Sequence, residues 1–196
     1  MTPRRLALVL ALLVLAAAAP KAWAGAPADQ LFARLDEVLK VLDDPELKKA
    51  GKGQERRQAI RQIANDILDF EEIAKRSLGR HWQMRSPAER DEFIRVFGEL
   101  LERAYIGKIE TYTGEKVAFL GDTIDGELGT VRTKIVTRQG TEIPVDYRML
   151  RRGDRWRAYD VVIEGVSLVA NYRAQFDKII QRASYQQLVK QVREKQ

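Results

Sequence analysis

The sequence predicts an α+β domain in which helices cover the apolar face of a four-stranded, curved antiparallel sheet. Apolar side chains recur at helical spacing from about residue 31 to residue 113, and then alternate with polar ones from about 117 to 163. After Glu164-Gly165 the helical period returns, so a strand turns directly into a helix that can lie over its own sheet. This helix either fills the concave face or leaves an apolar gap beneath it.

Residues 1–24 have the features of a signal peptide. Arg4-Arg5 precede an uninterrupted apolar run from Leu6 to Ala19, and Ala22-Trp23-Ala24 supplies a small-x-small cleavage site. The run is shorter than the roughly 20 residues of a membrane span, so a retained N-terminal anchor is the less favoured alternative. We therefore expect cleavage after Ala24 and a periplasmic location.

Residues 25–196 are expected to form a single domain with a sizeable core. Loss of Arg4, Arg5 and Lys21 lowers the formal charge from +6 to +3, and the remaining charges of both signs are interspersed. We therefore expect no nucleic-acid partner. The chain has no cysteine, so its stability in an oxidising compartment depends on its core and not on disulfides.

Six helices are predicted from the apolar period and from capping signals. Asp69 with Glu72 and Ser86 with Glu89 have the spacing of a capping box, and Ser167 is a candidate N-cap. The expected helices are about 31–43, 60–68, 69–79, 86–113, 168–179 and 185–194.

Four strands are predicted between the fourth and fifth helices. The first begins at Val117 and is expected to close at Gly121-Asp122, and a turn at Gln139-Gly140 joins the next two into a hairpin. The others are expected at about 129–138, 142–149 and 156–163. Alternation gives the sheet one apolar and one charged face.

The sequence offers few residues for catalysis or metal binding. His81 is the only histidine, is expected at the surface or at a helix cap, and has no cysteine to join it as a ligand. No metal site and no catalytic residue is therefore predicted. An acid/base pair from Asp146 or Asp160 remains possible, although Asp146 is expected in a surface ion pair beside Arg148.

The predicted site consists of apolar side chains that face inward between the sheet and the helices. By composition alone they could simply pack against one another, because apolar stripes usually form cores. They are Phe97, Leu101, Tyr105, Phe119, Val131, Ile135, Val145, Tyr147, Trp156, Val166, Val169 and Tyr172.

Several segments resemble one family over nearly all of residues 25–196. They include Asp69-Phe70, Leu78-Gly79-Arg80-His81-Trp82, Ser86-Pro87, Phe93 to Leu101, Tyr105, Tyr112, Val145-Asp146-Tyr147, Trp156, Tyr159-Asp160-Val161, Glu164-Gly165-Val166-Ser167, Tyr172-Arg173 and Phe176. The sequence is similar to the MlaC family, the periplasmic phospholipid-binding component of the pathway that maintains outer-membrane lipid asymmetry, also known as toluene-tolerance auxiliary transport proteins.

The resemblance implies a cone like that of nuclear transport factor 2-like proteins, with an apolar cavity for phospholipid acyl chains. It implies docking to the inner-membrane Mla ABC transporter complex and to the outer-membrane lipoprotein MlaA with its porin. It also implies a carrier without enzymatic activity or cofactor, whose phospholipid is cargo. The alternatives are a periplasmic lipoprotein chaperone, or an enzyme on the same scaffold with an acid/base pair in its cavity.

Overall fold

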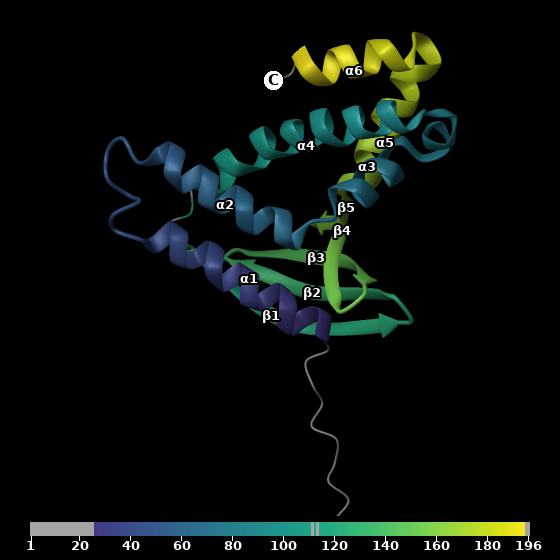
Figure 1. The fold of residues 1–196 in the computed structure, drawn as a ribbon. Helices are drawn as coiled ribbons and strands as arrows, with labels where there is room; N and C mark the ends of the chain where they lie inside the picture. Colours follow the sequence, from purple (N-terminus) through teal and green to yellow (C-terminus); the bar gives the residue numbers. More distant parts are fainter. Residues whose placement is uncertain (1–25, 111, 113, 195–196) are drawn as a thin grey trace, which may run out of the picture.

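The helices come from both ends of the chain, and the sheet is built from its middle (Figure 1). The computed structural model describes residues 26–110, 112 and 114–194, so the predicted signal peptide, residues 1–24, lies outside the described residues. The elements are α1 (Ala26–Asp43), α2 (Gly53–Ile67), α3 (Phe70–Leu78), the 3-10 helix η1 (Gly79–Met84), α4 (Pro87–Glu110), β1 (Lys116–Asp125), β2 (Leu128–Val136), β3 (Glu142–Arg152), β4 (Arg155–Ile163), β5 (Val166–Ser167), α5 (Leu168–Arg182) and α6 (Tyr185–Glu194).

In the described part of the chain the sheet has five strands in the order β1-β2-β3-β4-β5, each antiparallel to its neighbour. The α+β class and the antiparallel sheet are confirmed, but the predicted number of strands is too small by one. Glu164 and Gly165, with φ of 50° and 81°, make a two-residue turn that folds β5 back onto β4. Positive φ at both central residues is typical of hairpin turns that match the twist of the strands.

The first strand is longer than predicted. It runs to Asp125 and does not end at Gly121-Asp122. The pairing of β1 with β2 shifts between Phe119 and Gly121, which leaves Leu120 as the extra residue of a bulge. Gly121 has φ of 141°, so the glycine adapts the strand to the bulge and does not terminate it.

A second bulge lies in β4 and changes which of its residues face inward. Arg148 pairs with Asp160 and Met149 with Ala158, so Tyr159 is left without a partner in the register. Because side chains alternate along a strand, the extra residue reverses the alternation. Ala158 lies on the face covered by α1. Beyond the bulge, Val161 and Ile163 are the residues that point to this same face.

The predicted helix starts at Asp69, Ser86 and Ser167 are confirmed by their capping bonds. The Asp69 carboxylate accepts a hydrogen bond from the Glu72 N–H (3.0 Å), and the Ser167 hydroxyl accepts one from the Ala170 N–H (3.0 Å). Ser86 and Glu89 form a reciprocal capping box, with distances of 2.8 and 3.3 Å. Local signals therefore fix the entry points of α3, α4 and α5.

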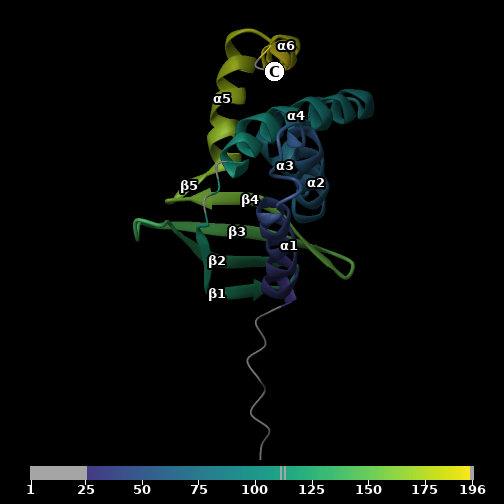
Figure 2. The same cartoon turned by 90° about the vertical axis from the view of Figure 1, so that its left-hand side faces the viewer.

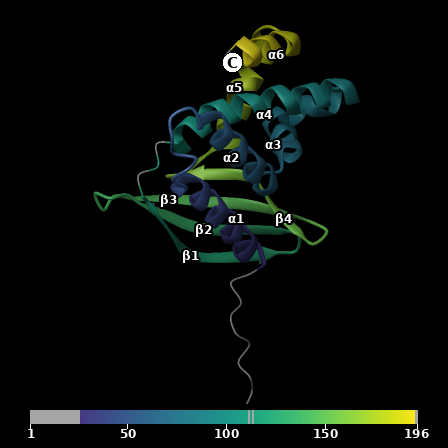
Figure 3. The ribbon, with the colours of Figure 1, turned by 60° about the vertical axis from the view of Figure 1, so that its left-hand side comes forward.

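The buried apolar residues of the described chain form two separate clusters. The sheet cluster joins α1 and α2 to β2, β3 and β4 through residues such as Leu31, Val131 and Met149. The helical cluster joins α3, η1, α4, α5 and α6 through residues such as Phe93 and Leu188. Figures 2 and 3 show α1 crossing one face of the sheet and α4, α5 and α6 stacked beyond the β4–β5 edge.

Candidate functional site

One face of the sheet, here called the inner face, carries apolar side chains from every strand. Its central row follows the pairing of Phe119, Thr133, Val145, Ile163 and Val166, from β1 to β5. Residues directly opposite each other on neighbouring strands place their side chains on the same face. The row is therefore continuous across the sheet.

Exposure rises toward both ends of this central row. Thr133 and Val145 are almost fully buried, whereas Phe119 is 43%, Ile163 37% and Val166 61% exposed. The Thr133 hydroxyl donates to the Val145 carbonyl oxygen (2.8 Å), so the polar group at the middle of the row is satisfied. An apolar surface thus extends from the core into solvent at the β4–β5 corner.

The strand residues of the predicted site all lie on the inner face. Val131 pairs with Tyr147 in the row on one side of the central row, and Val117 pairs with Ile135 in the row on the other side. Trp156 lies near the start of β4, at the opposite end of the strand from Ile163. The predicted face of the sheet is therefore confirmed by the register, and a role of these residues in ligand binding stays a prediction.

The helix residues of the predicted site belong to the helical cluster. Phe97, Leu101 and Val169 are buried in it, and the partly buried Tyr105 and Tyr172 pack against it. Burial raises the pKa of both tyrosine hydroxyls, and Tyr105 contributes a further rise to the pKa of Tyr172. The second half of α4 and the first turns of α5 therefore lie close together.

The predicted site is thus divided between two apolar bodies. Val166 ends the central row of the inner face, and Val169, three residues later, is buried in the helical cluster. Leu68, between α2 and α3, packs against both clusters. The predicted residues therefore do not form a single inward set.

Periodicity missed two residues of this arrangement. Ile163 was not among the predicted inward residues because counting every second residue from Trp156 places it on the outer face. Only the extra residue Tyr159 turns it inward. Leu68 was assigned to the stripe of the second helix, but it makes a parallel bridge to Ala158 at the edge of β4.

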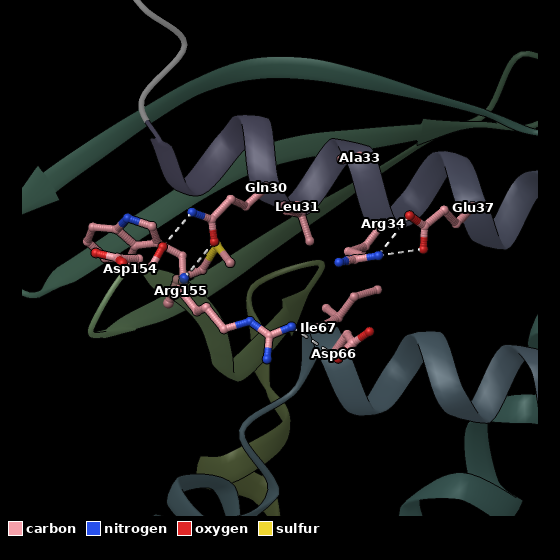
Figure 4. A pocket seen from close by; sticks show the side chains of 11 residues that line it. Gln30, Leu31, Ala33, Arg34, Glu37, Asp66, Ile67, Asp154 and Arg155 are labelled. Carbon is pink, nitrogen blue, oxygen red and sulfur yellow. Dashed lines mark hydrogen bonds and ion pairs between the residues drawn. The ribbon is translucent and has the colours of Figure 1, made fainter.

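A separate groove of about 290 Å³ lies between the N-terminal half of α1, the end of α2 and the β3–β4 turn (Figure 4). Trp156 and Met149 contribute to its apolar floor. Gln30 links α1 to the β3–β4 turn, because its side-chain amide donates to the Asp154 carbonyl oxygen (2.9 Å) and accepts from the Trp156 N–H (2.8 Å). Trp156 therefore serves the packing of α1 on the sheet.

Of the two carboxylates considered as acid or base, Asp160 has structural partners. Arg148 bonds to Asp160 (3.1 Å) and not to Asp146, so the predicted pair beside Asp146 is wrong. Asp160 also accepts from the Ser167 hydroxyl (2.6 Å) and the Val169 N–H (3.0 Å). Its carboxylate is thus fully engaged at the start of α5.

His81 is buried inside η1, so both predicted positions, the surface and a helix cap, are wrong. The 3-10 helix η1 turns its ring against α5, where Nε2 lies 2.7 Å from the Asp177 carboxylate. The hydrogen bond with His81 and the neighbouring Arg80 lower the pKa of Asp177. His81 therefore links η1 to α5.

Among the described residues, no group of three or more histidine, cysteine or acidic side chains is placed to hold a metal ion. No described helix combines the length and apolar character needed to cross a membrane.

Comparison with known proteins identifies relatives of this fold and sequence. The family model described as MlaC protein matches residues 33–194. The intermembrane phospholipid transport system binding protein MlaC of Haemophilus influenzae is 27% identical over 115 residues, which cover 55% of this chain and 54% of the relative. The toluene tolerance protein ttg2D of Pseudomonas putida is 23% identical over 126 residues, covering 63% of this chain and 59% of the relative. The matched region thus spans somewhat more than half the length of these curated relatives.

A solved structure agrees over a larger region. The phospholipid-binding protein from Ralstonia solanacearum, determined in complex with a phospholipid, superposes with a TM-score of 0.77 at 26% identity. The match covers 86% of this chain and 96% of the other. Together with the family model, which spans most of the sequence, this likeness establishes that the chain belongs to the MlaC family.

Proposed function

We propose that this protein is a periplasmic carrier that binds glycerophospholipid between its sheet and its helices. The observation that carries the proposal is the central row of the inner face, which runs from the buried Val145 to the exposed Ile163 and Val166. An apolar surface that continues from the core into solvent is typical of a site for an apolar ligand. The likeness to a protein determined with bound phospholipid supports the choice of ligand.

The energetics of acyl chains favour a carrier over free diffusion. Two chains contain about 30 methylene groups, and exposing each to water costs about 0.8 kcal/mol, so the whole lipid would cost on the order of 24 kcal/mol. A bilayer already shields these chains, and a carrier therefore needs only an environment of similar polarity. The net free energy of transfer is then small, and the direction of transport must come from the membrane partners.

The proposed route runs between two membranes. The carrier would exchange lipid with the inner-membrane Mla ABC transporter complex and with the outer-membrane lipoprotein MlaA and its porin, and so maintain the lipid asymmetry of the outer membrane. The names of the relatives, an intermembrane phospholipid transport binding protein and a toluene tolerance protein, support this assignment. In this role the carrier hydrolyses nothing.

The first test is the identity of the co-purified molecule. The chain is expressed with its leader in a Gram-negative host, purified from the periplasm without detergent, extracted with organic solvent and analysed by mass spectrometry. We expect about one glycerophospholipid per protein, released without cleavage of a covalent bond. A mock purification from the same host without the expressed chain measures background lipid.

The same preparation separates the proposal from its alternatives. The extract of a lipoprotein chaperone would contain peptide-linked diacylglycerol. An enzyme would turn over ester or carbonyl substrates, and the turnover would depend on Asp146 or Asp160. Asp146→Asn is expected to leave the lipid content unchanged, because Asp146 lies on the outer face opposite Arg132. Protein that repeatedly yields no stoichiometric phospholipid would contradict the proposal.

A further inference from the structure

Of the described aspartates, Asp69 and Asp160 are buried, and each lies where the helical cluster meets the sheet. Asp69 caps α3 through the Glu72 N–H, and it pairs with Arg152 of β3 at 3.2 Å. We call this arrangement the α3 clasp. The second arrangement, the α5 clasp, has the same design.

In the α5 clasp, Asp160 bonds to the N-terminal turn of α5 and to Arg148 of β3. The Val169 N–H and the Ser167 hydroxyl donate to its two oxygens at 3.0 and 2.6 Å, and Arg148 Nη1 lies 3.1 Å away. The Asp160 side chain is only 3% exposed, whereas that of Arg148 is 48% exposed. A buried carboxylate thus joins the sheet, the helix and an arginine that reaches in from the surface.

Building on the proposed function, we propose that the α5 clasp controls the release of bound phospholipid. Its residues Asp160, Arg148 and Ser167 are positioning residues, because they hold the first turn of α5 against β4. Val166 ends the inner-face row and Val169 belongs to the helical cluster, so this turn joins the two bodies between which the lipid is proposed to lie. Opening the α5 clasp lets the two bodies separate on that side.

The α3 clasp is reinforced in ways that the α5 clasp is not. The Asp69 N–H donates to the Ala158 carbonyl oxygen (2.9 Å), Leu68 bridges to Ala158, and Arg152 also reaches Glu72 at 3.5 Å. The α5 clasp instead follows a strand of two residues that leaves Val166 61% exposed. We therefore expect the α3 side to stay closed while the α5 side opens.

The rest of α5 is anchored independently of its clasp. The Phe176 ring packs edge-on against Phe93 and Phe97, with centroids 5.6 and 5.0 Å apart. Asp177, the next residue of α5, bonds to His81 of η1. Loss of the clasp should therefore free the first turn without detaching the helix.

The test measures release of a fluorescent phosphatidylethanolamine from the loaded protein to vesicles of phosphatidylethanolamine and phosphatidylglycerol. Arg148→Gln removes one partly buried hydrogen bond to Asp160, and Ser167→Ala removes the bond to Asp160 together with the N-cap bond from the Ala170 N–H. Each substitution should raise the release rate at least about five-fold. The lipid content after purification should stay unchanged. Arg132→Gln, on the same outer face of the neighbouring strand, is the matched control and should release lipid at the wild-type rate.

Arg152→Gln distinguishes the α5 clasp from general loosening. It should lower the melting temperature but change the release rate by less than about two-fold, since the α3 clasp keeps its backbone bonds. A release rate for Arg148→Gln within two-fold of wild type would overturn the inference. An equal acceleration by Arg152→Gln would overturn it as well.

Amide exchange tests the clasp without any lipid. In Arg148→Gln the Val169 amide should lose at least five-fold in protection, while the Phe176 amide keeps its wild-type protection. If the wild-type protein carried no phospholipid, the proposed function would fail, and the exchange result would still decide on the clasp. Unchanged protection of Val169 would overturn it.

Discussion

Glu164 shows how one residue can be held in an unfavourable conformation by its place in the fold. Among the described residues it is the only one other than glycine with a positive φ. Its N–H donates to the Pro144 carbonyl oxygen (3.0 Å), which fixes the turn between β4 and β5. A side chain in the left-handed region costs roughly 1 kcal/mol, and asparagine tolerates this region better than glutamate.

Glu164→Asn is therefore expected to stabilise the protein. The gain should be about 0.5 kcal/mol, or roughly 1–2 °C in melting temperature for a domain of this size. Thermal unfolding followed by circular dichroism measures it. Glu164→Gln removes the same charge without relieving the backbone, and should melt at the wild-type temperature. An asparagine variant that melts no higher than the glutamine variant would contradict the explanation.

Asp160 shows the limit of predicting a role from residue type. The sequence suggested a possible acid or base, because a carboxylate on a strand near a cavity can serve as one. The structure places it under the start of α5, where the Ser167 hydroxyl, the Val169 N–H and the Arg148 guanidinium donate to its oxygens. Its partners lie 7, 9 and 12 residues away, on the far sides of two turns, and no capping or strand pattern predicts that meeting.

At the scale of elements, the sequence predicted whatever depends on local chemistry. The N-cap bonds of Asp69, Ser86 and Ser167 join side chains to N–H groups three residues away, so they are visible in the chain. The return bond of a capping box forms at Ser86 but not at Asp69, whose N–H donates to the Ala158 carbonyl oxygen. Strand alternation likewise gave the inner face correctly from β1 to β3.

The bulges were not predictable in the same way. The extra residues Leu120 and Tyr159 are recognised only from their neighbours' pairing, and nothing in the single strand marks them. The two-residue strand β5 is too short for a period, so no strand was predicted between Glu164-Gly165 and the helix that follows. The Leu120 bulge and β5 border the central row, and the Tyr159 bulge decides that Ile163 belongs to it, so these features limited the prediction of the site.

The exposed end of that row provides a test that does not depend on burial. Val166→Glu places a charge beside the proposed acyl chains, but at 61% exposure it should change the stability by less than about 0.5 kcal/mol. We expect a folded monomer that retains much less phospholipid than the wild type, measured by mass spectrometry of the extract.

Met84→Glu is the matched control for this substitution. Met84 is 62% exposed and lies in η1, away from the sheet. It should keep the wild-type lipid content. If Val166→Glu also kept it, the β4–β5 corner would not border the lipid.

At the scale of the whole molecule, two apolar bodies replace the single core that composition suggested. The twelve predicted site residues were chosen as one inward set, and the structure distributes them between the inner face and the helical cluster. Periodicity identifies a buried face but not the body against which it packs, because that depends on how distant elements meet.

Each body has a tyrosine that can report on its stability, because Tyr185 is buried in the helical cluster and the partly buried Tyr147 packs against the sheet cluster. Burial raises the pKa of Tyr147, beside the sheet cluster, and of Tyr185, in the helical cluster, to about 12. The Tyr185 hydroxyl donates to the Glu89 carbonyl oxygen (2.9 Å). An unfolded tyrosine ionises near pH 10, so folding favours the neutral phenol.

Stability should therefore fall as the pH rises from about 10 to about 12. Below pH 10 both states are protonated and the contribution is complete, whereas above it the unfolded state loses its proton first. At pH 11 each tyrosine should lower the free energy of unfolding by about 1 kcal/mol relative to pH 8. Urea unfolding at the two pH values measures the difference, and lysine and arginine titration is common to all variants.

Tyr147→Phe and Tyr185→Phe should each reduce the stability lost between pH 8 and 11. The double variant should reduce this loss by the sum, because the two side chains lie in separate bodies. A double variant that loses as much stability as the wild type between pH 8 and 11 would show that neither phenol is held in its neutral form.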